Sequence, residues 1–89
     1  MFTIDECITN NIVELNVYYL QDNGIQDSTL EKYKYYYVIV SEIKNIDLKY
    51  FEGAEENEQY MIPTWEVKIG ERVYLFNAYD GSLIKTYIN

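Results

Sequence analysis

The spacing of apolar and polar residues changes along this chain, and it predicts which segments are helical and which are extended. Ile4, Cys7 and Ile8 fall at the three- and four-residue spacing of one helix face. They follow a Thr-x-x-Glu capping box at residues 3–6, which is typical of a helix start. We therefore predict a short helix over residues 4–10, ended by a pair of asparagines.

An alternation with a period of two dominates the rest of the chain and predicts β-strands. Val13, Leu15 and Val17 alternate with polar neighbours, and the segment from residue 35 is dense in Tyr, Val and Ile. In chain order, we expect strands at residues 12–21, 35–41, 44–51, 60–69, 73–77 and 83–88. Because no Gly or Pro separates the second of these from the third, one long strand bent by a bulge is an alternative there.

Turn-forming residues separate several of these segments. Gly70-Glu71 and Asp80-Gly81 are predicted hairpin turns, since Asp-Gly is a strong hairpin signal. Gly24 closes a cluster of polar turn residues after the first predicted strand.

Two further segments are less regular. Residues 52–59 carry four glutamates and are predicted to form a solvated acidic loop. Residues 27–34 remain open between two structures. A capping box at 28–31 favours a short helix over 29–32, whereas the aromatic residues from 33 onward favour a strand.

These elements predict one α+β domain over residues 1–89, an antiparallel sheet of about five to six strands with one or two short helices packed on one face. Pro63 has no N–H for a ladder hydrogen bond, so its strand is expected at an edge or at a bulge. Alternation on the same strand places Trp65, Val67 and Ile69 on one face, which favours a core position for the single tryptophan.

The charge balance narrows the range of partners. Fifteen acidic and seven basic residues give a net charge of −8. This argues against nucleic acid and against an anionic membrane surface, because both are bound by clustered Lys and Arg. A basic protein or a cation suits the charge better. No apolar run approaches the roughly 20 residues of a membrane helix, so we expect no membrane insertion by this chain, and any anchor would lie outside it.

Catalytic chemistry has little support. The chain contains no histidine, so Cys7 has no imidazole to activate it, and we interpret it as a structural thiol. Glu52, Glu55, Glu56 and Glu58 could supply oxygen ligands to Ca²⁺, but they lack the Asp- and Asn-rich, glycine-centred spacing of calcium loops. We therefore predict no enzymatic activity, no cofactor and no metal site.

The segment MIPTWEVKIGERVYLFNAYDGSLI, residues 61–84, places a Pro-x-Trp strand before a hairpin and an Asn-Ala-x-Asp-Gly turn. This order resembles the closing part of PepSY-like domains, which include the C-terminal domain of YycI-type regulators and related envelope lipoproteins of Gram-positive bacteria. The resemblance covers residues 42–86 and departs from the family at Asp80, where Thr is usual. The positions that match the motif and carry core or turn roles are Pro63, Trp65, Asn77, Ala78, Asp80 and Gly81.

The resemblance implies a non-enzymatic regulatory module that binds another protein, such as a membrane-associated sensor or a protease. It also implies an extracytoplasmic location, with membrane association through a segment absent from this chain. The alternative is a small acidic cytoplasmic protein of a phage or mobile element that inhibits a basic target by charge mimicry. The net charge and Met1 at the first position suit that alternative.

Aromatic residues supply the candidate binding face. Tyrosines at 33, 35, 36 and 37 would lie on both faces of the predicted strand over residues 35–41 and its approach. One face would expose Tyr36 beside Tyr18, and an exposed aromatic strip of this kind is typical of protein-binding surfaces. If that strand lies at a sheet edge, a partner could also bind by adding a strand of its own.

Overall fold

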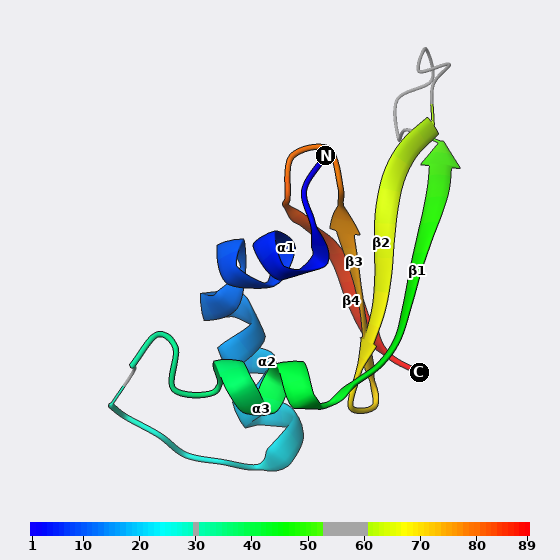
Figure 1. Cartoon of the computed structure of the whole chain (residues 1–89). Helices are drawn as coiled ribbons and strands as arrows, with labels where there is room; N and C mark the ends of the chain where they lie inside the picture. The colour runs from blue at the N-terminus through cyan, green and yellow to red at the C-terminus, as the bar shows by residue number, and fades with distance from the viewer. Residues whose placement is uncertain (30, 53–60) are drawn as a thin grey trace.

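Three short helices pack on one face of a four-stranded antiparallel sheet (Figure 1). The computed structural model describes residues 1–29, 31–52 and 61–89. The α+β class is as predicted, but the sheet has four strands in place of five to six, in the order β1-β2-β3-β4. The elements are α1 (Ile4–Asn10), α2 (Ile12–Asn23), α3 (Tyr36–Ser41), β1 (Ile43–Glu52), β2 (Met61–Ile69), β3 (Arg72–Asn77) and β4 (Leu83–Ile88).

Helix α1 forms as the capping box predicted. The Thr3 hydroxyl accepts a hydrogen bond from the Glu6 N–H at 3.1 Å, and the Glu6 carboxylate accepts from the Thr3 N–H at 2.9 Å. Asn11 ends α1 and starts α2, and its side-chain amide donates to the Cys7 carbonyl at 2.8 Å. The asparagine pair therefore turns the chain from one helix into the next.

Helix α2 replaces the strand that we predicted over residues 12–21. Ile12 and Leu15 are buried, and Tyr19 packs against the same core at the next helical turn. Val13 and Val17, which a strand would have placed beside Leu15, are more than half exposed. The odd-numbered alternation was coincidental, since a 3.6-residue period accounts for the buried positions.

Helix α3 replaces the strand predicted over residues 35–41, so the alternative of one long bent strand is also wrong. Ile39 is buried, with Tyr35, Tyr36 and Val40 packed around it at helical spacing. β-Branched and aromatic residues favour strands only weakly, and packing against the core overrides that preference here. Residues 32–35 form turns that lead into α3, so the strand from residue 33 is wrong. The described residues of the predicted helix over 29–32 are not helical either, and Leu30 lies outside the described residues.

The strands β1 to β4 lie close to the four predicted segments that follow α3. A two-residue turn joins β2 to β3, so that Ile69 is opposite Arg72, as predicted for Gly70-Glu71. The turn at Asp80-Gly81 joins β3 to β4, and the β3–β4 register shifts between Leu75 and Phe76. Pro63 lies in β2, between β1 and β3 in sheet order, so the prediction of an edge strand is wrong.

Pro63 is tolerated there because of its orientation. Its carbonyl accepts a hydrogen bond from the Ala78 N–H at 2.8 Å, on the side away from β1. The N–H and C=O of one strand residue point the same way. The missing N–H of Pro63 therefore removes no hydrogen bond from the β1–β2 ladder.

The core lies between the helices and the middle of the sheet. Its buried members are Cys7, Ile8, Ile12, Leu15, Ile39, Val67, Ile69, Tyr74 and Phe76. Arg72 and Asp22 join β3 to α2 at the margin of this core, with Nε–Oδ2 and Nη2–Oδ1 distances of 2.7 and 2.9 Å. Among the side chains that the structure describes, no buried residue comes from β1, although Ile43 at its start packs against the core. The helices therefore secure β2 and β3, and the rest of β1 pairs with β2.

Candidate functional site

The first strand presents an exposed apolar row along the edge of the sheet. Ile46, Leu48 and Tyr50 of β1 have exposed fractions of 44%, 37% and 57%. In the β1–β2 register they stand opposite Val67, Trp65 and Pro63, which places them on the sheet face that carries the helices. On β2 and β3 that face is mostly buried, but the helix layer does not extend over β1 (Figure 1). We call Ile46, Leu48 and Tyr50 the β1 row.

The backbone groups of the β1 row point away from the sheet. In a two-residue hairpin the residues that flank the turn exchange hydrogen bonds, so Ile69 points its N–H and C=O at β3. Along a strand, the N–H and C=O groups of successive residues point to opposite sides. The Pro63 carbonyl accepts from Ala78, so it points to the same side as the backbone groups of Ile69. The even-numbered residues of β2 therefore face β1, where they pair with Asn45, Asp47 and Lys49. The N–H and C=O groups of Ile46, Leu48 and Tyr50 consequently face the open edge.

Charged side chains lie on the opposite face of β1. Lys49 Nζ is 2.5 Å from the Glu66 carboxylate, and this hydrogen bond raises the pKa of Lys49. Lysines often protect an edge strand from pairing, but this ion pair draws the Lys49 charge toward β2. Asp47 stands directly opposite Glu66. The side-chain amide of Asn45 lies 3.4 Å from the Asp47 carboxylate. Within the described part of the chain, Asp47 has no ion-pair partner.

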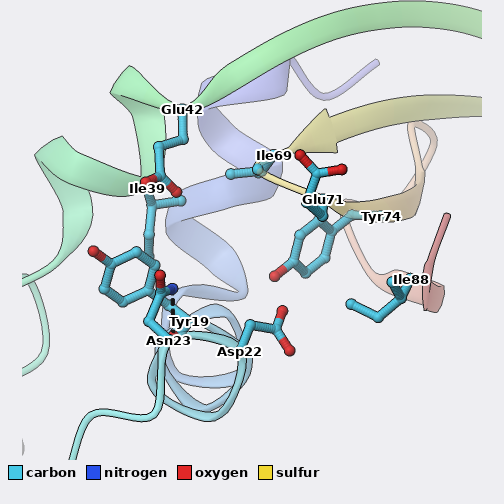
Figure 2. Close-up of a pocket in the computed structure, with 10 residues that line it drawn as sticks. Tyr19, Asp22, Asn23, Ile39, Glu42, Ile69, Glu71, Tyr74 and Ile88 are labelled. Carbon is cyan, nitrogen blue, oxygen red and sulfur yellow. Dashed lines mark hydrogen bonds between the residues drawn. The ribbon is translucent and has the colours of Figure 1, made fainter.

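A cavity of about 250 Å³ lies at the other end of the sheet, between α2, the end of α3 and the β2–β3 turn. Figure 2 shows the carboxylates of Asp22, Glu42 and Glu71 around it, and Ile39 and Tyr74 among its apolar lining. Asp22 is bound by Arg72, and Glu71 lies 2.8 Å from Lys44. The Lys44 ammonium lowers the pKa of Glu71, which is the opposite of what a general acid at neutral pH requires.

The two tyrosines predicted to form a binding face do not lie together on a strand. Tyr18 is on α2, where its ring meets Tyr74 edge-on at 6.2 Å and the Arg72 guanidinium lies 4.5 Å from its centroid. Tyr36 is on α3 and donates its hydroxyl hydrogen bond to Asp5. Both are partly buried and pack against the core. The strand on which the prediction rested is a helix, so the aromatic strip of Tyr18 and Tyr36 is not an exposed face.

The remaining tyrosines of this region are dispersed. Tyr37 is 82% exposed, Tyr33 is about half exposed, and Tyr35 is partly buried against Tyr19. Tyr37 and Tyr33 each meet the ring of Tyr36 edge-on.

Trp65 is partly buried and packs against the core together with Val67 and Ile69, on the face that alternation predicted. Its indole N–H donates to the Phe2 carbonyl at 2.8 Å. Ala78 is fully buried, and its carbonyl accepts a hydrogen bond from the Phe2 N–H at 2.6 Å. These residues fasten the N-terminal segment to the sheet.

The turn after β3 bonds its own backbone. The Asn77 side chain accepts from the Tyr79 N–H at 2.8 Å, and Asp80 accepts from the Ser82 N–H and hydroxyl at 2.9 and 2.7 Å. The hydrogen bonds from Ser82 lower the pKa of Asp80. Gly81 has a φ of 79°, and its carbonyl accepts from the Asn11 amide at 2.7 Å.

The chemistry-bearing side chains are placed as follows. Cys7 is fully buried, and burial raises the pKa of its thiol from 9.0 to about 11. Glu55, Glu56 and Glu58 of the acidic loop lie outside the described residues, as does the side chain of Glu52. In residues 1–29, 31–52 and 61–89, no three acidic or cysteine side chains are grouped so as to hold a metal ion. No helix in the same ranges has the length and apolar character needed to span a membrane.

No protein-family model, curated protein or solved structure matches this chain. The sequence did contain the alternation of Ile46, Leu48 and Tyr50, and the strand that it predicted is confirmed. The alternation does not indicate how far the helices extend over the sheet. The sequence therefore predicts this strand but does not predict that its apolar row is exposed.

Proposed function

We propose that this chain is a non-enzymatic protein-binding module that adds an extended strand of a partner protein to the free edge of β1. The observation that carries the proposal is the coincidence of two features in the β1 row. The same three residues offer exposed apolar side chains and backbone groups that no described segment of the chain pairs. Partners that bind by strand addition use backbone hydrogen bonds for affinity and alternate side chains for specificity.

The β1 edge also lacks most of the features that prevent another strand from pairing with it. β1 has ten residues, which is long for an edge strand. Natural edges are commonly kept short, bulged or charged to prevent pairing. Within the residues that the structure describes, the register of β1 shifts only between Ile43 and Asn45, ahead of the β1 row, and Lys49 is bound to Glu66. An exposed apolar row on such an edge is typical of an interaction site.

The resemblance to PepSY-like domains supports the same kind of function, because β1, β2 and the hairpin that follows occupy the segment that carries it. Under that resemblance the partner is a membrane-associated sensor or a protease, and the module is extracytoplasmic.

Peptide display tests the proposal. Random peptides as long as β1 are selected on the wild-type chain and then compared on Leu48→Lys, which places a charge in the β1 row. The matched control is Ile84→Lys, because Ile84 is an exposed apolar residue of β4, the other edge strand. We expect selected peptides with alternating apolar residues that bind wild type and Ile84→Lys but not Leu48→Lys. Peptides that bind all three proteins equally would refute strand addition at β1.

The cavity in Figure 2 favours a second candidate function, binding of a basic target by an acidic protein. An apolar floor edged by carboxylates suits the aliphatic stem and ammonium of a lysine side chain. Glu42 is the test position, because it has no ion-pair partner in the described part of the chain. If this function holds, Glu42→Gln should weaken capture of a lysine-rich peptide by wild type, and Leu48→Lys should leave it unchanged.

A further inference from the structure

We infer that the strand added to β1 is the β1 strand of a second copy of this chain, which gives a symmetric dimer with one continuous eight-stranded sheet. The inference rests on the proposed strand addition at β1 and names its partner. Its geometry is antiparallel, with Leu48 of each copy facing the other across the twofold axis. Closed twofold dimers are the commonest assembly of identical chains.

The backbone of β1 fits this axis. The outward-facing N–H and C=O groups belong to Ile46, Leu48 and Tyr50, as the register of β2 requires. When Leu48 faces Leu48 of the second copy, Ile46 faces Tyr50, and all three pairs are of the hydrogen-bonded type. Each such pair exchanges two hydrogen bonds, which gives roughly six across the edge.

The charges of β1 are complementary in the same register. The sequence Ile46-Asp47-Leu48-Lys49-Tyr50 places opposite charges at equal distances on either side of Leu48. Asp47 of each copy therefore faces Lys49 of the other, which forms two opposite-charge pairs. Opposite charges directly across an antiparallel pair stabilise it, and like charges destabilise it. An axis centred on Asp47 would place Asp47 opposite Asp47, a like-charge pair, and would place Tyr50 opposite Lys44.

The second copy places a positive charge beside Asp47. In its own chain it stands opposite Glu66, a like charge, and Lys49 is bonded to Glu66. The second copy brings a further Lys49 to the open side of Asp47. The lysine can then lie between two carboxylates, so that the like-charge pair within each chain gains a counter-charge.

The apolar side chains gain cover in the same arrangement. A twofold axis through Leu48, perpendicular to the sheet, keeps the helix layers of both copies on one side. The two β1 rows then meet in the middle of the joined sheet, with Leu48 against Leu48 and Ile46 against Tyr50. Trp65, next to Leu48 in the register, borders the strip that they form.

The first measurement is the mass of the full chain in solution by sedimentation over a concentration series. We expect a monomer–dimer equilibrium in the wild-type protein. Leu48→Pro removes an N–H that faces the open edge and spares the β1–β2 ladder, so it should abolish the dimer. Ile84→Lys on β4 should leave the equilibrium unchanged. Circular dichroism confirms that each variant is folded.

A charge exchange tests the register itself. Asp47→Lys places lysine opposite Lys49 of the second copy, and Lys49→Asp places aspartate opposite Asp47. Each variant alone should weaken dimerisation about tenfold or more, because two attractive pairs become repulsive. Mixed together, the two variants form opposite-charge pairs at both positions. Native mass spectrometry of the mixture should therefore show the heterodimer in large excess over either homodimer.

Each of the remaining outcomes refutes the proposed β1–β1 dimer. A wild-type chain that stays monomeric, but binds display-selected peptides through β1, overturns the dimer and leaves the proposed function standing. A monomeric chain without such peptides overturns both. A dimer that Leu48→Pro leaves intact, or a mixture without preference for the heterodimer, shows that the copies associate elsewhere or in another register.

Discussion

Replacing Gly81 by alanine should destabilise the fold more than the same replacement at Gly24, although both glycines have similar backbone conformations. Gly24 ends α2 with a φ of 61°, and Gly81 lies in the β3–β4 turn with a φ of 79°. Both are in the left-handed region that disfavours a side chain. The two sites differ in what a methyl group would meet.

The expected magnitudes follow from that difference. A Cβ at Gly24 has no heavy atom within 4 Å, so Gly24→Ala should cost only the conformational term, about 1 kcal/mol. A Cβ at Gly81 would lie 2.5 and 2.7 Å from two carbons of the Phe2 ring and 2.9 Å from the Asn10 side-chain nitrogen. Overpacking of this kind adds about 1–3 kcal/mol, which brings Gly81→Ala to about 2–4 kcal/mol.

Urea denaturation followed by circular dichroism gives the free energy of unfolding of both variants. The fluorescence of Trp65 adds a local measurement, because the Phe2 carbonyl accepts the hydrogen bond of its indole. If the Phe2 ring yields to the new methyl group, the native emission of Gly81→Ala should shift to longer wavelength. Gly24→Ala should emit as wild type does.

A double-mutant cycle identifies the clash. On a Phe2→Ala background the ring carbons that crowd the new methyl group are absent. The exposed Asn10 side chain can move away from the methyl group, so Gly81→Ala should then cost little more than Gly24→Ala does. Equal losses for Gly81→Ala with and without the Phe2 ring would refute the argument from packing, and so would equal losses at the two glycines.

Three further predictions concern the helix–sheet contacts. Tyr36→Phe should lower the free energy of unfolding by about 1 kcal/mol, because it removes the hydroxyl hydrogen bond to α1; an unchanged melting temperature would contradict the contact. Asp22→Asn should cost about 1–3 kcal/mol, because it weakens the paired hydrogen bonds from Arg72, and added salt should change this loss little. The free energy of unfolding should fall as the pH rises above about 9. Burial raises the pKa of Cys7 and Tyr74 above their ordinary values of 9.0 and 10.0. Both groups therefore lose their protons at lower pH in the unfolded chain than in the folded chain, which favours unfolding. Urea titrations over this pH range measure the loss, and a flat profile would contradict it.

The sequence was informative where a local rule determined the structure. The capping box located α1, and Asp-Gly and Gly-Glu located the two hairpin turns that join β2, β3 and β4. In each case the residues that decide the conformation are neighbours in the chain. The three C-terminal strands pair in chain order, so their local signals also determined the sheet order.

The sequence misled where packing decides. Residues 12–23 satisfy a period of two through Val13, Leu15 and Val17, yet the helix that forms leaves Val13 and Val17 exposed. α3 contains Tyr37, Val38 and Val40, residue types that favour strands. Packing into one core with residues that are distant in sequence, including those of β2 and β3, selects the helix in both segments. Because both predicted strands are helices, Tyr18 and Tyr36 do not form the predicted binding face.

The same packing explains why folding stability and partner binding should separate in this chain. The helices bury their apolar faces against β2 and β3. Among the described side chains the buried core includes Val67, Tyr74 and Phe76, and β1 adds to it only the partly buried Ile43. β1 is ordered by its ladder with β2 and contributes little to the core. Substitutions in the core should therefore unfold the chain. Charges placed in the β1 row should alter association and, at concentrations where the wild type is monomeric, leave the melting temperature close to that of wild type. A β1 variant that lost both together would show that the edge strand belongs to the core after all.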